Sequence, residues 1–173
     1  MPQHSHVSRR DYLFRSLWGG LGWAAGSAAA RCLAQSASIA EDAIDAHVHV
    51  WSPDTRQYPL SPRFSEADKV PASFTPEELF AHCRPAGVQR IVLIQMSFYE
   101  YDHSYMLEVM RGHPGVFSGV ALIDFRRDGV AREVDRLVDL GMRGFRLHSR
   151  GDAASWLNAP GMAELWRRAG AVS

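Results

Sequence analysis

Apolar runs and segments of helical periodicity alternate along residues 41–173 of the chain. Apolar or alternating runs bounded by turn residues predict strands at 43–51, 90–96, 116–123 and 142–147. Apolar positions spaced three and four residues apart predict helices at 76–84, 103–112, 128–141 and 161–169. The pattern therefore predicts four successive units, each made of a strand followed by a helix.

The boundaries of two helices are marked by specific residues. Thr75 is suited to the N-cap of the first helix, with Pro76 at the first helical position and Glu78 as the returning partner of a capping box. In the third helix the apolar positions fall on one face and charged residues on the other, and Gly141 closes it. These signals support the helical interpretation independently of the strands.

Alternating strands and helices indicate parallel strands joined by right-handed crossovers, either in an open doubly wound sheet or in a closed (β/α)8 barrel. The dinucleotide-binding type of open sheet needs a Gly-x-Gly-x-x-Gly turn after the first strand, where this chain has Trp51-Ser52-Pro53-Asp54. A complete barrel typically takes about 250 residues and eight units. The sequence therefore predicts an α/β fold that is the first half, four β/α units, of a (β/α)8 TIM barrel.

Composition narrows the class of protein further. The chain has 173 residues, of which 46% are hydrophobic and 22% charged, and its 19 basic side chains balance 19 acidic ones. This composition excludes a collagenous or strongly charged disordered protein, and the balanced charge predicts no nucleic-acid partner. Cys32 and Cys83 are too few and too far apart in sequence to indicate a disulfide framework or a cysteine-based zinc site.

Residues 1–40 differ from the rest of the chain. Arg9 and Arg10 stand in a basic start, a weakly apolar glycine-rich stretch follows, and small residues fill the end. This order predicts a signal peptide of the twin-arginine type, with residues 41–173 as the exported domain in the periplasm or outside the cell. The alternative is an amphipathic helix packed on the domain. The apolar stretch is too short and too rich in glycine to predict a stable membrane span.

Polar side chains gather where the predicted strands end. Strand alternation places Asp45, His47 and His49 on one face of the first strand, and two imidazoles at this spacing can bind one divalent cation. The same alternation places Gln95 and Ser97 at the end of the second strand. The alternative for the two histidines is a structural, hydrogen-bonded role, and polar groups also collect at ordinary strand ends.

On the fourth strand Arg146 and His148 fall in phase at the corresponding end, where a barrel forms the floor of its active site. We predict that Ser97, Arg146 and His148 bind substrate. The predicted partner is accordingly a small molecule.

The segments IDAHVHVW, VLIQMSFYEYDHSYML and GMRGFRLH, in this order, resemble the amidohydrolase-related family of (β/α)8 barrels, in the branch that holds sugar lactonases and 2-pyrone-4,6-dicarboxylate lactonases. The resemblance covers residues 44 to about 168. It implies that His47 and His49 are catalytic, either as ligands of a divalent metal ion, zinc first, or as groups that polarise a lactone carbonyl without metal. It also implies that Ser97 supplies a polar contact and that Arg146 holds a carboxylate or oxyanion.

The resemblance also implies groups that this chain does not contain. Members of the family carry further histidines after later strands and an aspartate base after the eighth. We therefore expect residues 41–173 to be an incomplete, truncated version of a hydrolase that opens a lactone or similar carbonyl bond. Two alternatives are a carbon–carbon lyase (decarboxylase) of the same fold and an inert half barrel that self-associates through its open edges.

Overall fold

The computed structural model describes residues 43–151 and 155–172. The predicted signal peptide, residues 1–40, lies outside the described residues, and export to the periplasm stays a prediction. The strands are β1 (Ala43–Val48), β2 (Val88–Ile94), β3 (Phe117–Leu122) and β4 (Met142–Arg146). The α-helices are α1 (Pro76–Cys83), α2 (Ser104–Gly112), α3 (Val130–Asp139) and α4 (Pro160–Ala171).

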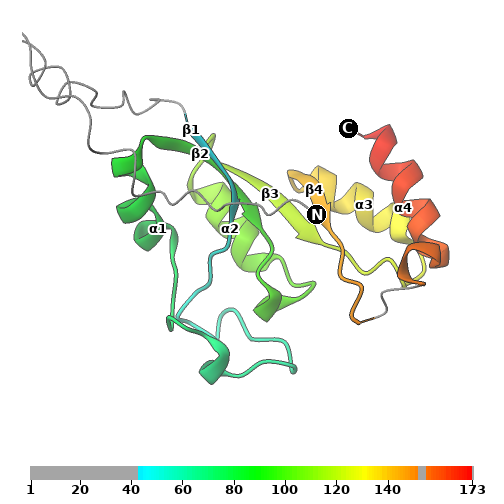
Figure 1. Cartoon of the computed structure of the whole chain (residues 1–173), viewed down its shortest axis with the longest axis horizontal. Coiled ribbons are helices and arrows are strands. Elements are labelled where there is room, and N and C mark those ends of the chain that lie inside the picture. Colours follow the sequence, from blue (N-terminus) through cyan, green and yellow to red (C-terminus); the bar gives the residue numbers. More distant parts are fainter. Residues whose placement is uncertain (1–42, 152–154, 173) are drawn as a thin grey trace, which may run out of the picture. The chain divides into compact units, whose positions relative to one another are not determined.

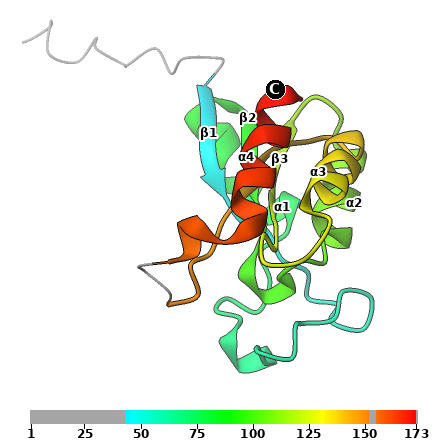
Figure 2. The ribbon, with the colours of Figure 1, turned by 90° about the vertical axis from the view of Figure 1, so that its right-hand side faces the viewer.

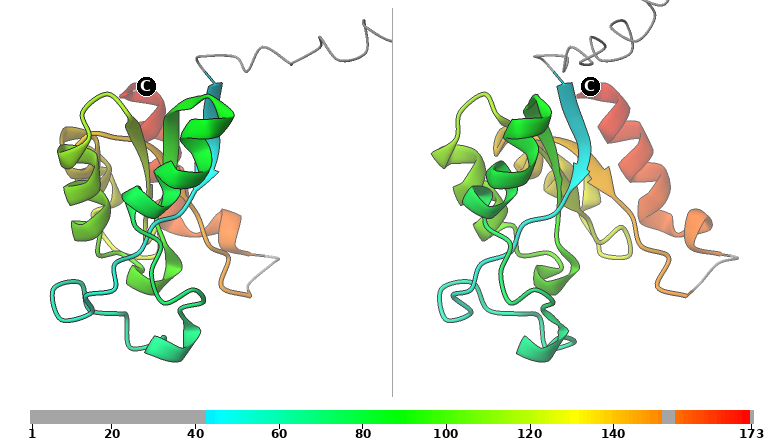
Figure 3. Two further views of the ribbon diagram at one scale, coloured as in Figure 1. Left: turned by 90° about the vertical axis from the view of Figure 1, so that its left-hand side faces the viewer. Right: turned by 60° about the vertical axis from the view of Figure 1, so that its left-hand side comes forward.

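The four strands form one parallel sheet in the order β1-β2-β3-β4, so neighbours in sequence are neighbours in space. In Figure 1 the helices follow one another from left to right in chain order, as the strands do. In Figure 2 helix α4 lies in front of the strands, and in the right view of Figure 3 helices α1 and α4 lie on either side of β1. The predicted fold, four β/α units of a TIM barrel, is confirmed.

Helix α1 begins where the sequence places its cap. The backbone N–H of Thr75 donates to Glu78 Oε2 at 2.6 Å, and the N–H of Glu78 donates to Thr75 Oγ1 at 3.4 Å. Both ends of the capping box are thus made, which satisfies two of the amide groups that the first turn of a helix leaves without partners. Helix α3 buries Val130, Val134 and Leu137 on the single apolar face that its periodicity predicts.

The core lies between the sheet and its helices. Ile91 and Leu93 of β2, Ala121 of β3 and Met142 of β4 are each at most 1% exposed. These buried positions alternate with partly exposed ones, such as Val92 of β2 and Val120 of β3, so one face of the sheet is covered more fully than the other. A well-packed sheet holds the carboxyl ends of its strands in fixed positions, which matters for the side chains that follow them.

Strand β1 ends earlier than the predicted 43–51. Its pairing with β2 is irregular between Asp45 and Val48, and the ladder stops there. Trp51 instead forms an isolated antiparallel bridge with Phe74, with N–O distances of 2.9 and 3.0 Å. This bridge closes the loop after β1 at its base.

The same loop is also held to the loop after β2, because the N–H of Ser61 donates to the carbonyl of Phe98 at 2.8 Å. The two loops therefore meet at the carboxyl end of the sheet.

Strands β1 and β4 are the edges of the described sheet. Next to β4, Phe145 and Leu147 line an apolar groove of about 400 Å³ together with Trp166 of α4, which is 62% exposed. Self-association through these edges stays a prediction. Over residues 43–151 and 155–172, no helix has both the length and the apolar character needed to span a membrane.

Candidate active site

The two histidines at the end of β1 converge. Their Nε2 atoms lie 3.3 Å apart, and their rings meet edge to face with centroids 5.0 Å apart. The Asp45 carboxylate turns back to accept a hydrogen bond from the backbone N–H of His47 at 3.1 Å. His47 is exposed and His49 is half-buried. The structure thus brings together the pair that strand alternation predicted to share a face.

The tautomer of His49 is set by the neighbouring strand. Its Nδ1 lies 2.8 Å from the carbonyl oxygen of Ile94, and since a carbonyl only accepts, Nδ1 carries the proton. Burial lowers the pKa of His49, and the positive charge of Arg146 and the nearby His47 lower it further against the opposing effect of the Ile94 hydrogen bond. His49 is therefore held neutral, with the lone pair of Nε2 directed at His47.

This arrangement fits two ligands of one cation. Two nitrogens bound to a tetrahedral zinc at about 2.0–2.1 Å lie roughly 3.3 Å apart, which is the separation of the two Nε2 atoms. A cation between the nitrogens would replace the proton that they share. Within the part of the chain that the structure describes, no group of three or more His, Cys, Asp or Glu side chains is placed to hold a metal. The described residues would thus supply two of the ligands of such a cation.

Arg146, at the end of β4, lies close to the histidines. Its Nη1 donates to the carbonyl oxygen of Gln95 at 3.1 Å, across β3. Its charge lowers the pKa of both His49 and His148, although burial is the larger cause in each case. Arg146 therefore places a positive charge within electrostatic reach of His49 and His148, where a substrate anion could bind.

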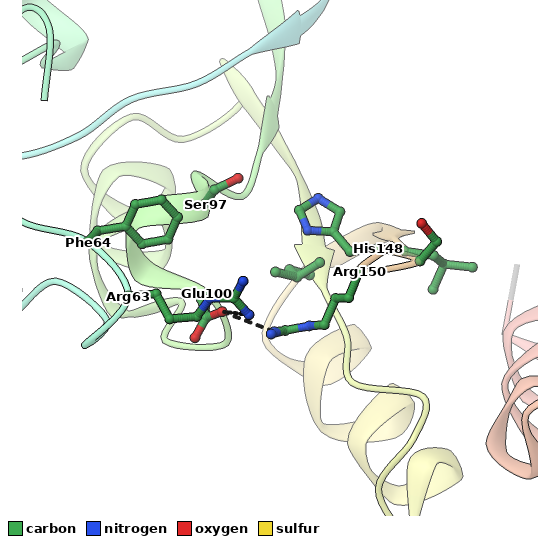
Figure 4. A pocket seen from close by; sticks show the side chains of 9 residues that line it. Arg63, Phe64, Ser97, Glu100, His148 and Arg150 are labelled. Atoms are coloured by element: carbon green, nitrogen blue, oxygen red, sulfur yellow. Dashed lines mark hydrogen bonds and ion pairs between the residues drawn. The ribbon is translucent and has the colours of Figure 1, made fainter. Parts of the chain in front are cut away.

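Ser97 and His148, two of the predicted substrate-binding residues, line one cavity of about 390 Å³ at the carboxyl end of the sheet (Figure 4). Ser97 begins a short 3-10 helix, Ser97–Tyr99, after β2. His148 follows β4, and the guanidinium of Arg126 holds this loop by donating to the carbonyl oxygens of His148 and Ser149 at 3.3 and 2.8 Å. Ser97 and His148 therefore bring the loops after β2 and β4 into one cavity wall.

Three charged side chains in this wall were not predicted from the sequence: Arg63, Glu100 and Arg150. Glu100 Oε1 lies 3.0 Å from Arg150 Nη2 and 3.8 Å from Arg63 Nη1. These residues occupy loops in which no periodicity assigns a face to a side chain. Their position after predicted strands was the one available signal, and it did not distinguish them from other loop residues.

Gln95 does not have the role that strand alternation predicted for it. It was grouped with Ser97 as a polar side chain directed to the site, but it is 1% exposed. Its Nε2 donates to the backbone carbonyls of Glu100 and Asp102 at 3.1 and 2.6 Å. Gln95 therefore supports the loop that carries Glu100, because a buried amide must find backbone partners.

Four parallel β/α units in the order β1-β2-β3-β4, with paired histidines at the end of the first strand, define the class of fold, that of the first half of a (β/α)8 TIM barrel. The chain belongs to the amidohydrolase family, whose model matches residues 44–172. The family that the His-x-His strand and the later segments resemble is thereby confirmed. Truncation of the chain and its signal peptide stay predictions.

Relatives of known description agree with this assignment. A 2-pyrone-4,6-dicarboxylate hydrolase of Comamonas testosteroni is 29% identical over 106 residues, which are 61% of this chain and 33% of that protein. The structure is similar to that of a probable 2-pyrone-4,6-dicarboxylic acid hydrolase from Acinetobacter baumannii with citric acid bound, with a TM-score of 0.59, 22% identity, and coverage of 76% of this chain and 46% of the other.

It is also similar to a zinc-bound amidohydrolase from Burkholderia multivorans, with a TM-score of 0.55, 21% identity, and coverage of 75% of this chain and 46% of the other. At this level of identity the two structural matches support the fold. The chain spans about a third of the length of the curated relative and less than half of the two solved chains.

Proposed function

We propose that this chain supplies one half of the active site of a hydrolase that opens a lactone or a similar carbonyl bond. The observation that carries the proposal is the 3.3 Å separation of the Nε2 atoms of His47 and His49, with His49 locked in the tautomer that leaves Nε2 free. The curated relative is a hydrolase of a lactone, which favours hydrolysis over the lyase chemistry found in the same fold.

His47 and His49 would hold a divalent cation, zinc first, through neutral imidazole nitrogens. When bound, zinc polarises a carbonyl oxygen and lowers the pKa of a water molecule. The zinc in the Burkholderia relative supports this choice of metal. Without metal, the Nε2–H of His47, which lies 3.3 Å from His49 Nε2, would turn from His49 to donate a hydrogen bond to the carbonyl oxygen of the substrate.

The other predicted residues would position the substrate. Ser97 would donate a hydroxyl hydrogen bond from the cavity wall, Arg146 would attract negative charge on the substrate or on the developing oxyanion, and His148, whose pKa is lowered, would offer a hydrogen bond from a neutral imidazole. These contacts come from β2 and β4, on either side of β3, so a substrate bound near the histidine pair lies over the middle of the sheet.

Zinc binding by the full chain tests the assignment. We expect isothermal titration calorimetry to show one zinc ion per pair of histidines, with at least about a hundredfold loss of affinity in His49→Ala. His113→Ala is the matched control, since His113 packs against Phe80 and Phe117 with ring centroids 5.1 and 5.7 Å away. Equal zinc affinity in wild type and His49→Ala would refute the metal site.

Hydrolysis of a γ-lactone by the same preparations tests the reaction. We expect a rate above buffer that falls to the buffer value in His49→Ala and is unchanged in His113→Ala. A wild-type rate equal to that of buffer would show that this chain by itself does not hydrolyse lactones.

A further inference from the structure

Glu100 has a backbone conformation that a glutamate rarely adopts. Its φ is 45° and its ψ is −109°, on the side of conformational space where glycine is the favoured residue. Arg150, on the loop after β4, also has a positive φ of 54°. Strained residues of this kind persist where the surrounding structure holds them, and they cluster at binding and catalytic sites.

The loop after β2 holds Glu100 in place through its backbone. The carbonyl of Glu100 accepts a hydrogen bond from Gln95 Nε2 at 3.1 Å, and its N–H donates to the carbonyl of Ser97 at 3.1 Å. The hydroxyl of Ser61 donates to Glu100 Oε2 at 2.7 Å, which also ties the loop after β1 to the carboxylate. The loops after β1 and β2 thus fix the backbone and the carboxylate of Glu100 in the cavity wall.

The carboxylate of Glu100 occupies the position that an acidic ligand would take between two arginines. Oε1 lies 3.0 Å from Arg150 Nη2, as the dashed line in Figure 4 shows, and 3.8 Å from Arg63 Nη1. Arg150 Nη2 also donates to the hydroxyl of Tyr101 at 2.9 Å. The Ser61 hydrogen bond and then Arg150 and Arg63 lower the pKa of Glu100, so the carboxylate is charged at neutral pH.

We propose that Glu100 is a specificity residue: an internal carboxylate that occupies the arginine side of the cavity, so that the site prefers a substrate with one carboxylate or none over a dicarboxylate. This inference rests on the proposed function, because it assumes that substrate enters this cavity. Arg146 offers one positive charge near the histidines, whereas a second substrate carboxylate directed at Arg150 would meet Glu100. Two carboxylates that contact the same arginine repel each other.

The same carboxylate is a hydrogen-bond acceptor for hydroxyl groups. A hydroxylated lactone, of the sugar-lactone kind, presents donors where a dicarboxylate presents a second negative charge. The name of the Comamonas relative specifies a substrate with two carboxylates. Glu100 would therefore favour a hydroxylated substrate over a dicarboxylate in this chain.

Two small acids that differ by one charge test the proposal. Glutarate and its monomethyl ester have the same chain length, and their dissociation constants from the 15N-labelled full chain are measurable by NMR titration at pH 7 without metal. We expect wild type to bind the monomethyl ester at least as tightly as glutarate. In Glu100→Gln the preference should shift toward glutarate by about tenfold, the effect of removing one nearby like charge.

Glu100→Gly is the second variant, because glycine adopts a positive φ freely and so keeps the fold while removing the carboxylate. It should shift the preference in the same direction. Glu133→Gln is the control: it breaks a comparable ion pair, with Glu133 Oε1 2.7 Å from Arg136 Nη2 on α3, and should leave the wild-type preference unchanged.

An unchanged preference in both Glu100 variants, or a wild-type chain that already binds glutarate more tightly than the monoester, would overturn the proposal. This outcome is distinguishable from failure of the proposed function. The acid titration contains no metal, so a chain that binds no zinc still reports the effect of Glu100. If neither glutarate nor its monomethyl ester shifts the cavity resonances at millimolar concentration, the cavity binds no anion. That result would refute the specificity role of Glu100.

Discussion

The histidine pair and the Glu100 loop both lie at the carboxyl end of the sheet, but they are built on different principles. His47 and His49 stand at the end of a strand, and the neutral His49 is positioned by a backbone carbonyl of the neighbouring strand. Glu100, Arg63 and Arg150 stand on loops, are charged, and are positioned by one another. Under the proposed function, chemistry that needs fixed geometry would lie at the end of a strand, while selection of the ligand would be left to loops.

If this contrast is correct, loosening the sheet should have the largest effect. Leu93 of β2 is fully buried beside Ile94, whose carbonyl orients His49. Leu93→Ala should lower the free energy of unfolding by about 2–5 kcal/mol through lost burial and a cavity. Urea denaturation followed by circular dichroism measures the change.

Leu140→Ala is the matched control, because Leu140 is 41% exposed and its truncation should cost well under half as much. Similar losses in the two variants would contradict the view that β2 is the rigid support of the histidine pair.

Strain in the Glu100 loop should reverse the usual order of stability between an alanine and a glycine variant. At Glu100 the positive φ disfavours alanine, so Glu100→Gly should be more stable than Glu100→Ala by about 1 kcal/mol. At the exposed Glu108 in helix α2 the order should be opposite, with glycine about 1 kcal/mol less stable than alanine. Thermal unfolding of the four variants is the measurement, and the same order at both sites would exclude strain at Glu100.

Acid should remove the contribution of the Glu100 carboxylate to the stability of the fold. The pKa of Glu100 is lowered in the folded chain by the Ser61 hydrogen bond, Arg150 and Arg63, so its stabilising effect is present above the ordinary glutamate pKa of 4.5. That effect is lost as the pH falls below 4.5 through the lowered value. The difference in unfolding free energy between wild type and Glu100→Gln should therefore be constant from pH 5 to 7 and shrink toward pH 3.

Urea denaturation across this range measures the difference. A gap between wild type and Glu100→Gln that stays constant down to pH 3 would mean that the Glu100 carboxylate is not bound by its neighbours.

The smallest expected effect is a shift in the pKa of His148, which lies near charges from both regions. Burial lowers the pKa of His148 most, Arg146 and Arg150 lower it further, and Glu100 raises it. Arg146→Gln should therefore raise the pKa of His148, and Glu100→Gln should lower it. NMR titration of the imidazole C–H signals detects both shifts, and shifts of the same sign would show that His148 does not lie between these charges.

The sequence by itself determined the four β/α units, the capped start of α1 and the pairing of His47 with His49. These features follow from periodicity and local hydrogen bonding, which depend on residues close together in the chain. The predicted end of the first strand was wrong because the pairing of β1 with β2 becomes irregular after Asp45, and no local pattern reports the register with a distant strand.

Only the tertiary structure decided which charges share the cavity. Arg63, Glu100 and Arg150 come from three loops separated by dozens of residues, and their ion pairs exist because the sheet brings those loops to one end. Likewise the structure turned Gln95 from a site residue into a buried support of the Glu100 loop. Strand periodicity assigns a side chain to a face, but loops have no such period, so their contacts depend on packing across the whole sheet.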